Sequence, residues 1–340
     1  MKKTLIALAA VAAASASFAQ SSATVYGIAD MYVGKTTTSA SGVNASVGAN
    51  VTSGGMSGSR LGFKAVEDLG GGMSATVVYE TAVGIDAPAA TSLGNRVSTL
   101  SLASGANSLT LGNQYTPALN YMACNSAIGC HNQDQSAPNS SLRFGNSIAY
   151  GYNAAPFSIL AMAAFKEDGT LEGGNAGAFT GIGGTFTAGA LVVGLVIESD
   201  STATAGATAS NLTGLSATYN FGAFSLGAIA NSLRNSGNLD GSNRTGFGLQ
   251  AAVPFNNGQN AVHFSYGSNS ASGAASSSTT TSFSGLFNHT LSKTANVFAF
   301  YNQNTQDQNS GLYTNFGVGG TAGVNNRITT TMGIGARKSF

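Results

Sequence analysis

Gly214-Leu215-Ser216-Ala217-Thr218-Tyr219-Asn220-Phe221 is a stretch in which apolar side chains alternate with small or polar ones. Successive side chains of a β-strand point to opposite faces, so a period of two indicates a strand with one apolar and one polar face. Residues 60–65, 73–80 and 246–253 follow the same period. We therefore expect an all-β protein whose sheet has one apolar face.

Sixteen such strands can be placed along the chain. They are expected to start near Thr24, Ser59, Gly72, Asn95, Ser108, Asn146, Phe157, Phe179, Ala190, Leu212, Phe224, Arg244, Gln259, Thr280, Thr294 and Arg327. Short turns, such as 69–71 and 222–223, alternate with longer polar stretches, such as 35–58 and 116–142. An even strand number with short periplasmic turns and long extracellular loops is typical of a transmembrane antiparallel β-barrel of the Gram-negative outer membrane.

Composition and physical constraints favour this barrel over a soluble sandwich, which would show the same alternation. Only 8% of the residues are charged, whereas a soluble domain usually has about 25%. Lipid cannot satisfy the hydrogen bonds of an open sheet edge, so the sheet must close. A barrel of about sixteen strands is wide enough for an aqueous channel. Tryptophan is absent, so the 11 Tyr and 18 Phe must supply the aromatic girdles.

The N-terminus reads as an export signal. Lys2 and Lys3 precede an apolar run over 5–14, and Ser17-Phe18-Ala19 is a small-x-small cleavage site. The apolar run is too short for a membrane-spanning helix. We expect a signal peptide over 1–19 and a single β-barrel domain over 20–340.

Charge and cysteine content limit the other classes. Without Lys2 and Lys3 the formal charge falls from +1 to −1, so no basic excess points to nucleic acid. Cys124 and Cys130 are close in sequence, and in an exported protein such a pair favours a local disulfide. Zinc would need four ligands, and only His131 is nearby.

Several segments resemble the general, trimeric porins of Gram-negative bacteria, especially those of β-proteobacteria. The most specific is Ser59-Arg60-Leu61-Gly62-Phe63-Lys64-Ala65-Val66-Glu67-Asp68-Leu69-Gly70-Gly71-Gly72, and 23–30, 109–117, 146–150 and 291–294 also fit. The final Phe340 matches the C-terminal assembly signal of these barrels. The resemblance implies a homotrimer of water-filled sixteen-stranded barrels. In each barrel the third loop folds into the lumen and faces a ladder of wall arginines.

Three departures from that family pattern stand out. The family often has Arg where this chain has Asn113 and Thr294, and the first change lowers the positive charge near the pore mouth. The cysteine pair inside 116–142 is not expected from the family. If Cys124 and Cys130 are bonded, the ring they close would either stiffen the constriction or act as a loop staple without effect on conduction.

Pore residues follow from strand parity. Arg60 and Lys64 share the polar face of one strand, and Arg143 lies on the polar face of another. An arginine costs about 2–4 kcal/mol at the lipid-facing midplane, so these side chains should face the lumen. Arg96 matches a family position, although its parity is that of outward-facing leucines. The alternative is that some of these cations lie at the rim and bind lipopolysaccharide phosphate.

Asp134 is the one carboxylate within 116–142 and is therefore the expected counter-charge on the third loop. Four cations, Arg60, Lys64, Arg96 and Arg143, against this single anion predict a mild anion preference.

The sequence shows no catalytic or cofactor motif. The three histidines, His131, His263 and His289, are widely separated, and the Gly-rich stretches 181–184 and 317–320 do not open a helix after a strand. We expect no enzyme and no cofactor. A general diffusion pore for small hydrophilic solutes and ions, in contact with outer-membrane lipid and lipopolysaccharide, is the favoured reading. A substrate-selective channel and a non-conducting adhesin or structural barrel are the alternatives.

Overall fold

The computed structural model describes residues 21–40, 43–87, 92–129, 132, 142–165, 178–201, 208–236, 241–273, 278–307 and 326–340. In this part of the chain no helix is long and apolar enough to cross a bilayer. The elements are β1 (Ser22–Ala40), β2 (Val43–Ser53), β3 (Arg60–Gly70), β4 (Met73–Ala82), β5 (Val97–Ser104), β6 (Asn107–Tyr115), η1 (Leu119–Ala123), β7 (Arg143–Ala154), β8 (Phe157–Ala164), β9 (Ala178–Ala188), β10 (Leu191–Ser201), β11 (Ser210–Asn220), β12 (Ser225–Arg234), β13 (Asn243–Phe255), β14 (Asn260–Ser272), β15 (Ser278–Ser292), β16 (Ala295–Gln306) and β17 (Arg327–Ser339).

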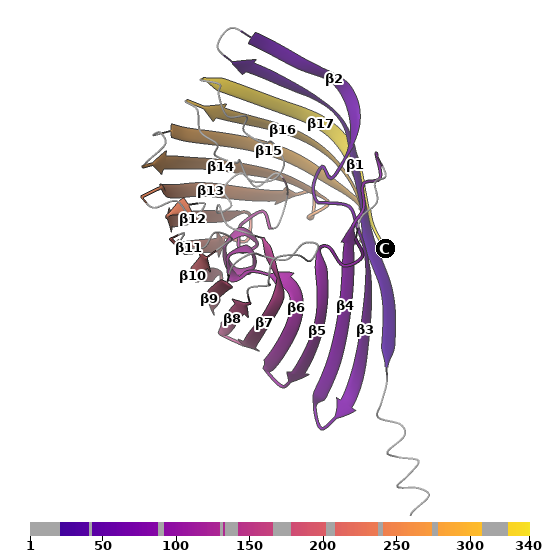
Figure 1. Ribbon diagram of the computed structural model, residues 1–340. Coiled ribbons are helices and arrows are strands. Elements are labelled where there is room, and N and C mark those ends of the chain that lie inside the picture. The colour runs from indigo at the N-terminus through magenta and orange to yellow at the C-terminus, as the bar shows by residue number, and fades with distance from the viewer. Residues whose placement is uncertain are drawn as a thin grey trace, which may run out of the picture.

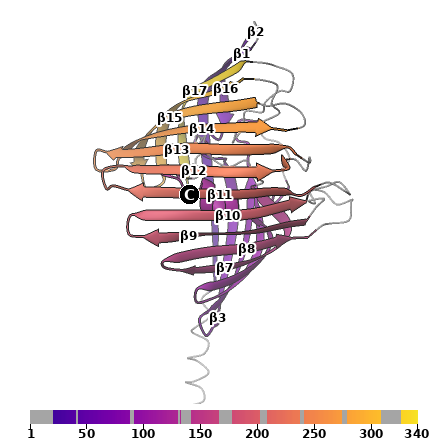
Figure 2. The same cartoon turned by 90° about the vertical axis from the view of Figure 1, so that its left-hand side faces the viewer.

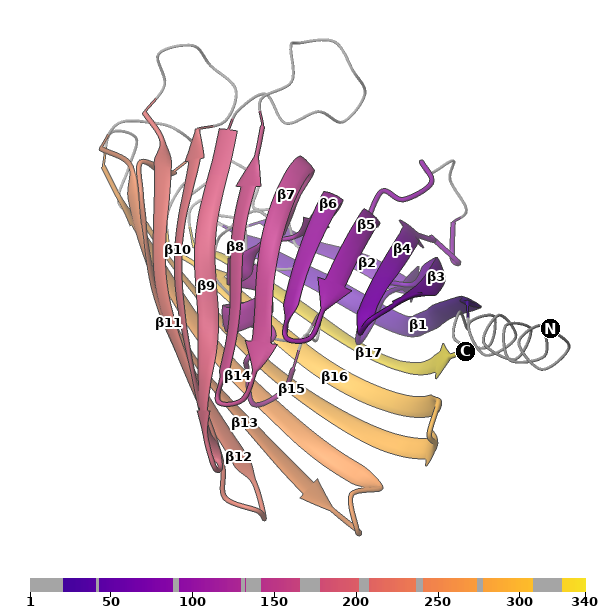
Figure 3. The same cartoon turned by 90° about the horizontal axis from the view of Figure 1, so that it is seen from below.

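The first and last strands close the sheet into a barrel. β1 pairs antiparallel with β17 along most of its length and with β3 through its first seven residues, from Ser22 to Ile28. From β3 to β17 each strand pairs antiparallel with its neighbours in sequence. Among the seventeen described strands, all except β2 therefore form a closed ring of sixteen, which confirms the predicted fold (Figure 3).

Each of the sixteen predicted strands begins within three residues of an observed strand. The sequence did not predict β2, which falls inside the polar stretch 35–58. β1 runs on to Ala40 and forms a hairpin with β2, so it pairs with β17 on one edge and with β2 on the other. This part of β1 is a run of threonine and serine with no apolar face, and alternation could not reveal it. β2 stands above the other strands at the top of Figure 1.

The barrel has an apolar outer face and a polar inner face. On β11, Leu215 is 50% exposed whereas the next residue, Ser216, is 1% exposed. Similar pairs recur on neighbouring strands, which lie side by side when the wall is seen from outside (Figure 2). An apolar outer surface suits lipid, and the pairing of β1 with both β17 and β3 closes the ring of sixteen strands.

Candidate functional site

Two arginines meet one carboxylate on the inner wall. Glu80 follows the outward-facing Tyr79 on β4 and is 7% exposed. Its Oε1 lies 2.6 Å from Nε of Arg96 and 3.7 Å from Nη1 of Arg60. Its other oxygen, Oε2, accepts a hydrogen bond of 3.3 Å from the Tyr26 hydroxyl. Glu80 is therefore the counter-ion of this cluster.

A tyrosine connects the third arginine to the same cluster. The Tyr115 hydroxyl accepts hydrogen bonds of 3.2 Å from Nη2 of Arg96 and 3.2 Å from Nη2 of Arg143. The Arg143 guanidinium also lies over the Tyr115 ring, 4.5 Å from its centroid, in a cation–π contact. Arg60, Arg96 and Arg143 all line one cavity of about 760 Å³. The structure thus brings together three of the four predicted cations.

Arg96 reaches the lumen for a reason that strand parity hides. β5 begins only at Val97, so Arg96 lies in the bend before the strand and is not bound by the strand's alternation. Its backbone N–H donates to the Glu80 carbonyl at 3.0 Å, which places the side chain beside the Glu80 carboxylate. The predicted role in the cluster is therefore compatible with the outward-facing leucines that follow.

Lys64 lies farther along β3. It has the parity of Arg60 and is exposed, but it is not among the residues that line the arginine cavity. Asp134 and Cys130 lie outside the described residues. Cys124 lines the cavity and is disulfide-bonded, whereas its pairing with Cys130 stays a prediction. Phe340 exchanges two backbone hydrogen bonds with Gly27, of 3.0 and 3.1 Å, and its side chain is 61% exposed.

In the third loop, residues 116–129 enter the barrel as the magenta coil visible inside it in Figure 1. Its described part is fixed to the inner faces of β10 and β11. The Ala118 N–H donates to Glu198 Oε1 at 2.7 Å, and the Ser216 hydroxyl donates to the Tyr121 carbonyl at 2.8 Å. Asn125 donates to the Ser216 hydroxyl at 3.0 Å. Hydrogen bonds with the inward-facing Glu198 and Ser216 therefore hold the described part of the loop against this side of the barrel.

Glycines make room for the loop on the wall. A Cβ at Gly194 would lie 2.2 Å from the Tyr121 carbonyl oxygen, and one at Gly214 would lie 2.0 Å from Met122 Sδ. Met122 is fully buried and packs in an apolar cluster with Ala118, Val196, Leu212 and Ile229. Glycine at these two wall positions therefore leaves space for the Tyr121 carbonyl and for the Met122 side chain.

A second inward-turning segment, residues 54–59, meets the third loop from the opposite side. It links β2 to β3 and carries Met56, which is 2% exposed and packs beside Phe298 and Phe300. Asn132 of the third loop donates through Nδ2 to the Gly54 carbonyl and through its N–H to the Met56 carbonyl, both at 2.7 Å. The sequence assigned this segment only to a long polar loop, and nothing in its composition marked it as part of the pore lining.

The sequence also did not single out Glu80 and Tyr115 as site residues. Glu80 has the polar-face parity of Ser74 and Thr76, so its inward direction could have been read from alternation. Tyr115 lies at the end of β6, where the third loop begins. Its contacts with Arg96 and Arg143 depend on strands distant in sequence.

A closed barrel with an apolar exterior and charged groups gathered in its lumen defines the class of outer-membrane β-barrels. The profile of the Gram-negative porin family matches residues 4–310, and the chain belongs to this family, which places it in the outer membrane. It is 41% identical over 118 residues to outer membrane porin protein 32 of Delftia acidovorans, a stretch that is 34% of this chain. The match spans about a third, 33%, of that relative's length.

Solved structures share the fold over nearly the whole chain. An anion-selective porin from Comamonas acidovorans superposes with a TM-score of 0.77 at 23% identity, covering 94% of this chain and 100% of that one. OmpF of Salmonella typhi gives 0.68 at 13% identity, with 94% and 97% covered. OmpT of Vibrio cholerae gives 0.67 at 15% identity, with 94% and 98% covered. At these identities the likeness shows the fold.

Proposed function

We propose that this chain forms a water-filled channel through which small hydrophilic solutes and ions diffuse passively, with a mild preference for anions. The observation that carries the proposal is the cavity lined by Arg60, Arg96 and Arg143, which share one nearby carboxylate, Glu80. Three guanidinium groups against one carboxylate leave this part of the lumen positively charged. Low-dielectric walls concentrate the field of such groups on the solution between them.

The anion preference follows from the positive charge of the three arginines that line the cavity. An anion passing the cluster meets fixed positive charge, while a cation meets an electrostatic barrier. The described part of the third loop adds no carboxylate. The relative from Comamonas acidovorans is itself an anion-selective porin, which supports the same sign here.

Planar-bilayer recording of the refolded protein under a potassium chloride gradient tests this function. Stepwise currents with a reversal potential of the anion-selective sign are expected. Stepwise currents with a reversal potential of the cation-selective sign would contradict the proposed anion preference but would still support a diffusion channel. Flux that saturates for one solute would favour a substrate-selective channel, and a folded protein without current would favour a non-conducting barrel.

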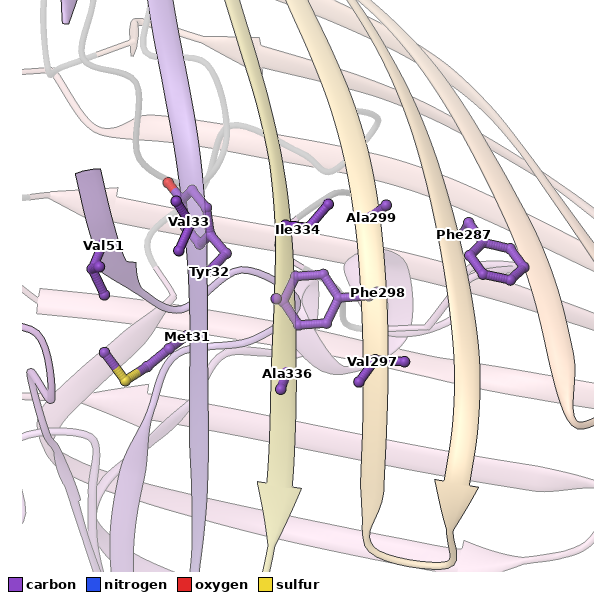
Figure 4. A pocket seen from close by; sticks show the side chains of 11 residues that line it. Met31, Tyr32, Val33, Val51, Phe287, Val297, Phe298, Ala299, Ile334 and Ala336 are labelled. Atoms are coloured by element: carbon purple, nitrogen blue, oxygen red, sulfur yellow. The ribbon is translucent and has the colours of Figure 1, made fainter. Parts of the chain in front are cut away.

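We propose that the protein assembles as a homotrimer. A structure of Vibrio cholerae OmpT is of a trimer form. On this chain an apolar hollow of about 640 Å³ opens on β1, β2 and β15–β17, with Val33, Val51 and Ile334 at its surface (Figure 4). Packing against a second barrel would fill this hollow with side chains. Photo-crosslinking from a probe attached at Val51→Cys, with the outward-facing Leu195→Cys as the matched control, tests the contact: a probe at 51 should capture a neighbouring barrel and one at 195 should not.

Export and membrane contacts complete the proposal. Residues 1–19 act as a signal peptide and 20–340 as one barrel domain, Phe340 serves as the assembly signal, and lipopolysaccharide contacts the outer surface. N-terminal sequencing of the outer-membrane form should begin at Gln20. Deletion of Phe340 should lower the amount of assembled barrel without changing the amount exported.

A further inference from the structure

A buried carboxylate lies behind the pore lining. Asp30, on β1, is 0% exposed. Its Oδ1 accepts the N–H of Gly55 at 2.7 Å, and its Oδ2 accepts the N–H groups of Met56 and Ser57 at 3.0 and 2.8 Å. Three successive backbone donors therefore converge on one side chain. Such a row of N–H groups binds an anion well, and hydrogen bonds to a charged acceptor are stronger than neutral ones.

The main chain of Asp30 holds both ends of the same segment. Its carbonyl accepts the Gly54 N–H at 2.7 Å and the Ser59 hydroxyl at 3.0 Å. Its own N–H donates to the Ser59 hydroxyl oxygen at 3.0 Å. The segment 54–59 is thus fixed at its start, middle and end to a single residue of the wall.

Segment 54–59 positions two parts of the pore lining, the third loop and Arg60. Asn132 of the third loop makes its two 2.7 Å hydrogen bonds to the carbonyls of Gly54 and Met56. The Gly58 carbonyl accepts a hydrogen bond of 3.0 Å from Arg60 Nε, which orients that guanidinium toward Glu80. Gly54, Ser57 and Gly58 themselves line the arginine cavity. A shift of the segment would therefore move the loop and one selectivity arginine together.

The place where segment 54–59 contacts Asp30, which we call its seat, is tightly packed. A Cβ at Gly55 would lie 2.5 Å from the Phe298 ring and 3.2 Å from Asp30 Oδ1. Without the carboxylate, the N–H groups of Gly55, Met56 and Ser57 would lose these acceptors in a buried place, which is costly.

We infer that Asp30 is a positioning residue of the pore: through segment 54–59 it sets the place of the third loop and of Arg60, and so keeps the open channel steady and anion-preferring. The effect on conduction rests on the proposed function. The hydrogen-bonded attachment of segment 54–59 to Asp30, which we call the clamp, can be tested without recording any current.

The main test compares Asp30→Asn with Asp68→Asn in the full-length refolded barrel. Asp68 also accepts a backbone N–H, that of Gly70 at 2.8 Å, but it does so at an exposed turn, so the control removes the same charge far from the lumen. In Asp30→Asn we expect amide hydrogen exchange at 55–57 to speed up by about tenfold or more. We also expect greater open-channel current noise and a reversal potential closer to zero. Asp68→Asn should match the wild type.

Two further variants keep the test decisive if Asp30→Asn does not fold. Gly55→Ala disturbs the same seat without changing any charge and should raise the noise in the same way. Asn132→Ala should raise the noise of the wild-type channel but add little to Asp30→Asn or Gly55→Ala, because all three act through one segment.

Some outcomes would overturn the inference. Unchanged exchange at 55–57 in Asp30→Asn, or in Gly55→Ala, would remove the clamp. Faster exchange with wild-type noise and reversal potential would show that the clamp does not position the pore. A wild-type barrel without current would overturn the proposed function and the role in conduction, while the exchange measurement would still decide the clamp.

Discussion

Glu80 and Arg96 form an ion pair inside the barrel, with 2.6 Å between Oε1 and Nε and side chains that are 9% and 16% exposed. The two residues are held in register because the Arg96 N–H also donates to the Glu80 carbonyl at 3.0 Å. The counter-charge of the arginine cluster therefore stands on the wall itself, next to the arginines. Its place determines what each charge substitution should do.

Replacing Glu80 with Gln should strengthen the anion preference. The change removes the carboxylate that partly neutralises Arg96 and Arg60 and keeps the side-chain size. Reversal potentials under a salt gradient should move further toward the chloride equilibrium value. Glu67→Gln, at an exposed position near the turn of β3, serves as the control and should leave the potential unchanged. A shift of Glu80→Gln in the cation direction would contradict the assigned role.

Removing two guanidinium groups should do the opposite. In Arg60→Ala with Arg143→Ala, Arg96 and Glu80 remain as a nearly neutral pair, so selectivity should shift toward cations. The same reversal-potential measurement checks this, with Lys293→Ala at an exposed turn as the control. An unchanged potential would mean that these arginines do not face the permeating ions.

Gly194→Ala should narrow the channel. The added methyl would lie 2.2 Å from the Tyr121 carbonyl oxygen, so the third loop must move off the wall into the lumen. Overpacking of this kind typically costs about 1–3 kcal/mol. Single-channel conductance should fall. Gly285→Ala is the matched control, because its nearest atom would be 3.9 Å away, and equal conductance in the two variants would argue against the close fit of the loop.

Reduction of the disulfide at Cys124 should raise the current noise. With the predicted partner Cys130, the bond would close a ring within the third loop, and cutting it would restore conformational freedom. Recordings with and without a reductant check this, and the double variant Cys124→Ala, Cys130→Ala should show the same noise and no response to the reductant. Identical traces in all cases would leave the bond as a staple without effect on conduction.

Leu100→Arg should destabilise the barrel, whereas Ser101→Arg should not do so to the same extent. Leu100 is 47% exposed on the outer face of β5, and the adjacent Ser101 faces inward. Arginine against lipid near the midplane costs about 2–4 kcal/mol. Urea unfolding in lipid vesicles measures the difference, and equal stabilities would reverse the assignment of the two faces.

The sequence alone determined the barrel. Alternation such as that of Leu215 and Ser216 is a local property, and together with turn spacing it predicted the sixteen strands of the closed ring, their approximate starts and the lipid-facing side, but not β2. It also marked Arg60 and Arg143 as lumen residues, because an arginine in a membrane-spanning strand is strongly destabilising if it faces lipid and must therefore point into the lumen.

Only the tertiary structure decided which groups meet. Glu80, Tyr115 and Arg143 come from three different strands, and no periodicity along the chain relates them. Segment 54–59 has the composition of an ordinary polar loop, yet much of it is buried because Asp30 supplies acceptors for its N–H groups. Alternation reports which face of the sheet a residue takes, whereas contacts across the lumen depend on how the closed sheet and its inward loops bring distant segments together.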